Sequence, residues 1–78
     1  MYYTTIKKRC DKLGLSIREL EKQAGIGNGT VGRWDVASPR VDQLSKAAKV
    51  LGVSTMTLVR EAEIMAEMNK HDKLGKAD

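Results

Sequence analysis

The fold of this chain is most readily recognised in SIRELEKQAGIGNGTVGRWD, residues 16–35. Ser16 and Glu19 have the S-x-x-E spacing of a capping box, in which both side chains satisfy free backbone amides at a helix start. Apolar residues then recur at helical spacing and predict one buried stripe: Ile17, Leu20 and Ala24. The stretch therefore begins with a short amphipathic helix over residues 17–24.

A glycine turn follows and leads into a second helix. Gly25 stands where the chain must adopt a left-handed conformation to leave the first helix. The side chain of Ile26 is expected to be buried in the core. Residues 28–35 then supply about two more helical turns. Two short helices joined by a tight glycine turn form a helix-turn-helix, whose second helix can lie in the major groove of DNA.

An ordered set of residues runs through and beyond this stretch. It comprises Leu15-Ser16, Leu20, Gly25-Ile26, Thr30-Val31, Arg33-Trp34-Asp35, Ser38-Pro39, Leu44, Ala47-Ala48, Leu51-Gly52-Val53-Ser54 and Leu58. With this set, residues 6–59 resemble the Cro/lambda-repressor-like (XRE) family of bacterial and phage transcription regulators. The resemblance implies an all-α, five-helix bundle that binds operator DNA, usually as a dimer on a near-palindromic site.

The composition agrees with a small helical domain. The chain has 78 residues, no Phe and one Pro, which argues against a β-sandwich or barrel. One cysteine permits no intramolecular disulfide and fits a reducing cytosol. The sequence has no apolar run of membrane-spanning length and no signal-peptide core at its N-terminus. We expect a cytoplasmic protein of bacterial or phage origin, without membrane association.

Positive charge is concentrated in the first part of the chain. Residues 1–60 carry 11 Lys and Arg against five Asp and Glu, whereas residues 61–78 carry three against five. Phosphate binding requires this kind of basic domain. A solvated Lys-rich surface would give the same balance, so the charge supports DNA binding only together with the helix-turn-helix.

Three further helices are predicted outside residues 16–35. The first begins near Thr4 or Thr5, either of which can cap it, and ends at Gly14. Ile6, Cys10 and Leu13 share one face, which Tyr2 or Tyr3 extends if the helix starts early. Cys10 is expected to be a small core residue. The next helix is capped by Ser38, with Pro39 at its first position. Its buried stripe comprises Val41, Leu44, Ala47, Ala48 and Leu51, and Gly52 ends it.

The last helix is capped by Ser54 and runs over residues 55–69. Its core face comprises Leu58, Val59, Ala62, Met65 and Ala66. Residues 1–70 then form the helix-turn-helix domain, and the polar residues 71–78 a flexible tail. Ile64 and Met68 lie outside the core face, so we expect them to contact a second copy in a homodimer. The alternative is two scattered exposed apolar side chains.

Helical geometry predicts how residues 28–35 are oriented. At about 100° per residue, Val31 and Trp34 point into the core, although Trp34 could instead stack on a base. Asn28, Gly29, Gly32 and Arg33 then face the groove, and Thr30 lies on the other flank. The resemblance places Asn28, Gly29 and Thr30 at the forward edge in the groove.

The expected base contacts are Asn28, Gly29, Thr30 and Arg33. Asn28 can pair with adenine and Arg33 with guanine, each pair worth about 1–3 kcal/mol of discrimination. Thr30 can touch a thymine methyl group or a phosphate, and Arg33 can equally lie on a phosphate. The alternative for each is a solvated side chain. Phosphate contacts, which position the domain, are expected from Ser16, Arg18, Ser38 and Arg40.

The sequence departs from the family pattern in three ways. Many relatives carry Gln where Ile17 stands, and Ile cannot hold a phosphate. Relatives usually carry Ala where Glu21 stands; we hypothesise that Glu21 reaches the amides at the start of the second helix, since Gly27 has no capping side chain. A solvated Glu21 is the alternative. Interior glycines also weaken that helix by about 1 kcal/mol each: Gly27, Gly29 and Gly32.

The sequence carries no catalytic constellation and no metal-ligand spacing, so we expect neither an enzyme nor a cofactor. The leading hypothesis is a sequence-specific regulator of double-stranded DNA, and within that a phage or mobile-element repressor. The alternative is a protein-interaction module of the same fold, such as an antitoxin or antirepressor, that acts through its last helix or its groove.

Overall fold

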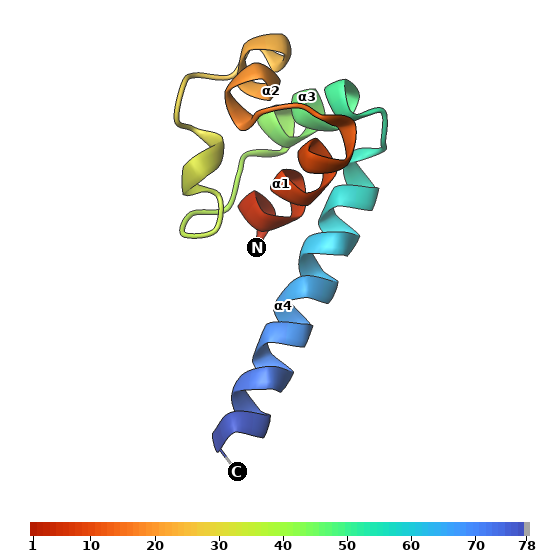
Figure 1. Cartoon of the computed structure of the whole chain (residues 1–78). Helices are drawn as coiled ribbons and strands as arrows, with labels where there is room; N and C mark the ends of the chain where they lie inside the picture. Colours follow the sequence, from red (N-terminus) through yellow and green to blue (C-terminus); the bar gives the residue numbers. More distant parts are fainter. Residues whose placement is uncertain (78) are drawn as a thin grey trace.

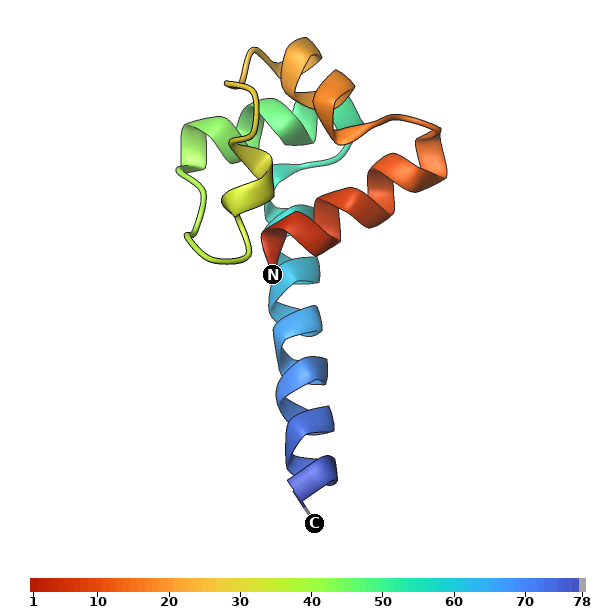
Figure 2. The same ribbon diagram turned by 60° about the vertical axis from the view of Figure 1, so that its left-hand side comes forward.

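The computed structural model describes the backbone of residues 1–77 and the side chains of residues 1–68. Its elements are α1 (Tyr2–Leu13), α2 (Ile17–Ala24), a 3-10 helix η1 (Val31–Arg33), α3 (Val41–Leu51) and α4 (Thr55–Ala77). These residues contain four α-helices and no strand, so the predicted all-α class is confirmed. In Figures 1 and 2, α1, α2, η1 and α3 gather at one end, and α4 extends away from them as a long arm.

The predicted start and end of α2 are confirmed. The Ser16 hydroxyl oxygen accepts the Glu19 backbone N–H at 3.0 Å, and a Glu19 carboxylate oxygen accepts the Ser16 N–H at 3.3 Å. Gly25 follows the helix with φ +71°, in the left-handed region that glycine adopts without strain. Local side chains thus fix both ends of this helix.

One apolar core joins all the elements. It contains side chains from every helix and from the connection after α2: Ile6, Cys10, Leu20, Ile26, Val31, Trp34, Leu44, Ala47, Ala48, Leu51 and Leu58. The expected burial of Ile26 and Cys10 is confirmed. Burial also raises the pKa of the Cys10 thiol, with a smaller contribution from the negative charge of Asp11, which makes it a packing residue rather than a nucleophile.

Three side chains predicted for the core are exposed instead: Leu13, Val41 and, on α4, Ala66. Leu13 lies in the last turn of α1 and is 59% exposed, while Leu15, beyond the Gly14 turn, packs against the core. Val41 is the first residue of α3 and is 76% exposed. Side chains of a helix lean toward its N-terminus, so Val41 projects past the packed part of α3, whose buried stripe begins at Leu44.

Two helix starts differ from those predicted. α1 begins at Tyr2 rather than at Thr4 or Thr5, and α3 begins at Val41 rather than after Ser38. The residue that precedes α3 is Arg40, with an extended backbone (φ −73°, ψ 149°) and no side-chain capping bond. Asp42 supplies a negative charge in the first turn of α3, where it interacts favourably with the helix dipole.

The predicted helix over residues 28–35 is wrong, because only Val31–Arg33 are helical and they form a 3-10 turn. Gly29 has φ +87°, outside the range of a right-handed helix. An α-helix therefore cannot start at Asn28 and pass through Gly29. Four α-helices and one 3-10 turn replace the predicted five helices.

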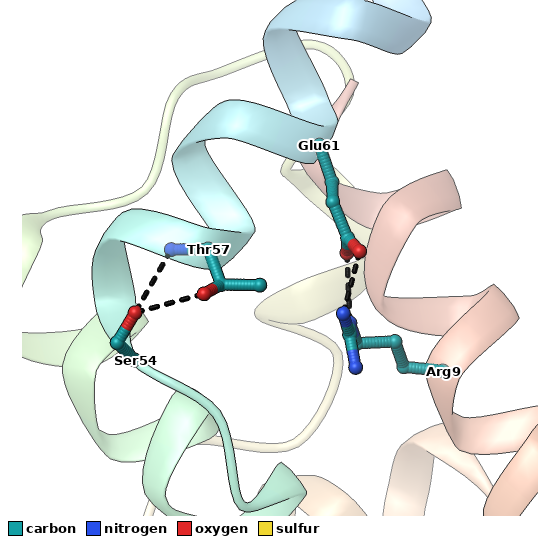
Figure 3. Close-up of polar contacts among 4 residues, drawn as sticks. All are labelled: Arg9, Ser54, Thr57 and Glu61. Atoms are coloured by element: carbon teal, nitrogen blue, oxygen red, sulfur yellow. Dashed lines mark hydrogen bonds and ion pairs between the residues drawn. The ribbon is translucent and has the colours of Figure 1, made fainter.

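The start of α4 is as predicted, and its body is fixed to α1. The Ser54 hydroxyl oxygen accepts the Thr57 backbone N–H at 3.1 Å, and Arg9 Nε donates to Glu61 Oε1 at 2.7 Å (Figure 3). On the predicted core face, Leu58 and Ala62 are buried, whereas Ala66 is exposed. The helix runs to Ala77, past the predicted end at 69.

The predicted flexible tail, residues 71–78, lies outside the residues whose side chains are described, so it stays a prediction, as does the domain boundary at residue 70. Within residues 1–77, every helix is too short or too polar to cross a lipid bilayer.

Candidate nucleic-acid interface

The surface that sequence analysis singled out is built on residues 27–35, the recognition segment. Val31 is fully buried and Trp34 is 4% exposed, so both side chains anchor the segment in the core, as predicted. Turn-type hydrogen bonds of 3.0–3.1 Å connect its backbone, from Thr30 N–H to Gly27 and from Trp34 N–H to Val31. Because the Trp34 side chain is buried, it is not available to stack on a base.

Glu21 holds the start of the recognition segment. One carboxylate oxygen accepts the Gly29 backbone N–H at 3.1 Å, and the other accepts the Val31 N–H at 2.9 Å. The residue is only 3% exposed. The hypothesis that Glu21 reaches these amides is confirmed, and the alternative of a solvated carboxylate is wrong.

Two glycines shape the turn that Glu21 holds. Gly29 has φ +87°, and a Cβ there would meet no atom within 4 Å, so the backbone conformation alone favours glycine. At Gly27, a Cβ would lie 3.2 Å from the Thr30 hydroxyl oxygen. Residues 27–30 therefore form a compact turn rather than the first turn of a helix.

Asp35 ties the far end of the segment to α1. Its Oδ1 accepts the backbone N–H of Tyr3 at 3.0 Å and that of Thr4 at 3.4 Å, and its Oδ2 accepts the Thr4 hydroxyl at 2.7 Å. The carboxylate thus caps the N-terminus of α1 from a distant part of the chain. The sequence does not indicate this role of Asp35, because no local spacing links residues so far apart.

The expected base-contacting residues lie together on this anchored segment. Asn28, Gly29 and Arg33 are exposed, and Thr30 is half-buried. Asn28 also lines a shallow hollow of about 260 Å³, which it shares with residues of α2 and the following turn: Arg18, Glu21, Lys22 and Ile26. The structure thus brings Arg18, an expected phosphate contact, and Asn28, an expected base contact, to the same hollow.

The remaining expected phosphate contacts are exposed but lie on different elements. Ser16 precedes α2, and its oxygen already accepts the Glu19 N–H, which leaves its hydroxyl proton to donate. Ser38 and Arg40 are exposed in the connection between η1 and α3. Ile17, where relatives carry Gln, is half-buried and packs against the core, so here the position contributes to packing.

A second surface lies between α1 and α4. It is a groove of about 480 Å³, lined by Thr4, Thr5, Lys8, Arg9, Lys12, Glu61, Ile64, Met65 and Met68. Ile64 is 55% and Met68 63% exposed, as their position on the helix predicted. Apolar side chains of α4 and basic side chains of α1 both line this groove.

Over the part of the chain that the structure describes, His, Cys, Asp and Glu form no group of three that could hold a metal ion. A family model described as helix-turn-helix matches residues 6–58, most of the chain. No curated protein and no solved structure matches the chain significantly.

Proposed function

Because the chain belongs to the helix-turn-helix family of the Cro/lambda-repressor (XRE) type, whose members bind DNA as transcription regulators, we propose that it is a sequence-specific regulator of double-stranded DNA, encoded by a phage or mobile element and acting as a repressor. One observation carries the proposal. The exposed Asn28 and Arg33 lie on a segment whose back is fixed by Val31 and Trp34. Fixed donors and acceptors of this kind are what base recognition requires.

Base contacts are assigned to the exposed side of the recognition segment. Asn28 pairs with the N6 and N7 positions of adenine, and Arg33 with O6 and N7 of guanine or with a nearby phosphate. Thr30 contacts a thymine methyl group or a phosphate. Gly29 has no side chain, so the DNA backbone or a base edge can approach closely beside Asn28.

Phosphate contacts are assigned to the start of α2 and to the connection before α3. Ser16 and Arg18 serve at the first site, and Ser38 and Arg40 at the second. The excess of Lys and Arg in residues 1–60 adds non-specific attraction. These contacts set the orientation of the domain, and the recognition segment then supplies sequence preference.

We propose that two copies of the chain bind one operator. A single short recognition segment reaches few bases, so useful specificity requires two half-sites. Ile64 and Met68 leave apolar area exposed along the α1–α4 groove, and contact with a second copy would remove that area from water. The homodimer is therefore part of the proposal.

The same groove favours one other function. Lys8 and Lys12 line it together with apolar side chains of α4, a combination suited to an acidic amphipathic helix of another protein. In that case the chain is an interaction module such as an antitoxin or antirepressor. Its DNA binding would then be weak and independent of sequence.

Duplex binding at several salt concentrations distinguishes the two functions. For the regulator, affinity for DNA falls steeply with salt, each neutralised phosphate contributing about 0.9 to the logarithmic slope. Asn28→Ala lowers affinity for the preferred duplex by about 5- to 150-fold, the equivalent of about 1–3 kcal/mol. Gln23→Ala, which truncates an exposed amide on α2, is the control and leaves affinity unchanged. Equal affinity for all duplexes, unaffected by Asn28→Ala, would support the interaction module.

A further inference from the structure

The buried carboxylate of Glu21 is an unusual partner for a DNA-binding segment. Both of its oxygens are occupied by backbone amides of that segment, those of Gly29 and Val31. The residue is 3% exposed, and within residues 1–68 no Lys or Arg nitrogen lies within ion-pair distance of it. Its charge is compensated by amide hydrogen bonds rather than by a cation.

Such an arrangement is an inefficient way to stabilise a fold. Removing a carboxylate from water is costly, and apolar side chains of similar volume often stabilise a core as well or better. What the two hydrogen bonds do specify is the relative position of Gly29 and Val31, on either side of Thr30 and directly after Asn28. Buried polar groups that are fully satisfied fix one conformation of the backbone around them.

We infer that Glu21 is a positioning residue for sequence recognition: it fixes the turn formed by residues 27–31, so that Asn28 and Thr30 meet the base edges in one geometry. The inference rests on the proposed function. A segment with glycine at positions 27, 29 and 32 has many accessible conformations. Glu21 selects one of them before DNA binds, which lowers the entropic cost of specific binding.

Because Glu21 is negatively charged, the loss of its charge and the loss of its positioning role are expected to change DNA affinity in opposite directions. A carboxylate close to a phosphate-binding surface repels DNA, so removing it without other consequence would strengthen binding to any duplex. Loss of the positioning role is expected instead to weaken binding, and only to the preferred duplex.

The experiment compares Glu21→Gln with Asp11→Asn. Each removes one negative charge, and Asp11 is exposed on α1, where it pairs with Lys7 of the same helix. Two probes are used at fixed salt: a duplex selected with the wild-type protein from a random pool, and a mixed-sequence duplex of equal length. Asp11→Asn is expected to leave the ratio of the two affinities unchanged. Glu21→Gln turns one acceptor into a donor that faces an amide, and is expected to lower the ratio about tenfold.

Amide hydrogen exchange provides a second readout that needs no DNA. In the wild type, the amide protons of Gly29 and Val31 exchange slowly, because both are bound to the carboxylate. In Glu21→Gln at least one of them exchanges at least tenfold faster, while the amide of Ala48 in α3 does not change. The wild-type measurement alone tests the inference if the variant does not fold.

Two results would overturn the inference while the proposed function stands. One is an unchanged affinity ratio in folded Glu21→Gln, and the other is rapid exchange of the Gly29 amide in the wild type. Failure of the wild-type protein to select any duplex would contradict the proposed function itself.

Discussion

Gly29 and Gly32 lie three residues apart in the recognition segment but have different roles. Gly29 has φ +87°, whereas Gly32 has no positive φ, and an added Cβ would meet no atom within 4 Å at either position. The two sites therefore differ in backbone conformation and not in available space. A left-handed conformation costs a residue with a Cβ roughly 1–2 kcal/mol.

We expect Gly29→Ala to lower the free energy of unfolding by about 1–2 kcal/mol. Gly32→Ala is expected to raise it by about 0.4–1 kcal/mol, because alanine restricts the unfolded chain and fits the native backbone. Urea titration followed by the fluorescence of Trp34, the single tryptophan, measures both. Equal effects at the two positions would show that the left-handed turn is absent in solution.

Individual residues of the candidate site were predictable to different degrees. The burial of Val31 and Trp34 follows from their spacing, which survives the change from an α-helix to a 3-10 turn because both remain on one side. The Glu21 contact could be predicted from the lack of a capping side chain at Gly27. The Asp35 contact could not, since its partners Tyr3 and Thr4 are more than 30 residues away and no short-range pattern links them.

Among the elements, α4 depends on α1 for its orientation. Leu58 and Ala62 pack into the core, and Arg9 binds Glu61 across the two helices. The hydrogen bond from Arg9 holds the pKa of Glu61 below its ordinary value of 4.5. A carboxylate with a lowered pKa in the folded state stabilises the fold above its unfolded-state pKa. That contribution is lost as the pH falls through the folded-state pKa.

We therefore expect Glu61→Gln to destabilise the protein at pH 7 and to have a progressively smaller effect as the pH falls below about 4.5. The Glu61 side chain is 38% exposed, so solvent screening limits the effect at pH 7 to below about 1 kcal/mol. Thermal unfolding of both proteins from pH 3 to 7 measures it, with Glu63→Gln, an exposed carboxylate on the same helix, as the control. A difference that is constant with pH would argue against the ion pair.

Most helix ends that carry a local capping signal were predictable from the sequence, but the start of α3 was not. The capping residues Ser16 and Ser54 and the terminal glycines Gly14, Gly25 and Gly52 mark ends that the structure confirms. Ser38 and Pro39 have the same type of signal, yet α3 begins only at Val41, after Arg40 with its extended backbone. The helix predicted over 28–35 failed because Gly29 adopts a backbone conformation that periodicity of apolar residues cannot report.

At the scale of the whole molecule, apolar area and charge are unevenly distributed. Ile64 and Met68 are exposed on the groove side of α4, beside basic residues of α1. Met56 is 70% exposed on the same helix but does not line the groove. Met56 therefore provides a matched control position outside the groove for a test of the proposed dimer surface.

We expect the wild-type protein to sediment as a dimer at micromolar concentration and Ile64→Ser to sediment as a monomer. Met56→Ser removes a similar exposed apolar side chain outside the groove and is expected to remain a dimer. A monomeric wild type that binds operator DNA as one copy would contradict the proposed dimer.

We propose that the exposed edge of the recognition segment selects bases while the buried Val31 and Trp34 fix the segment to the core. Selection of bound duplexes from a random pool, carried out with the wild type and with Asn28→Ala, tests this proposal. We expect the wild type to enrich a site with two oppositely oriented half-sites, and Asn28→Ala to lose preference at one position in each half-site. A wild-type pool without enrichment, or an identical site selected by both proteins, would contradict it.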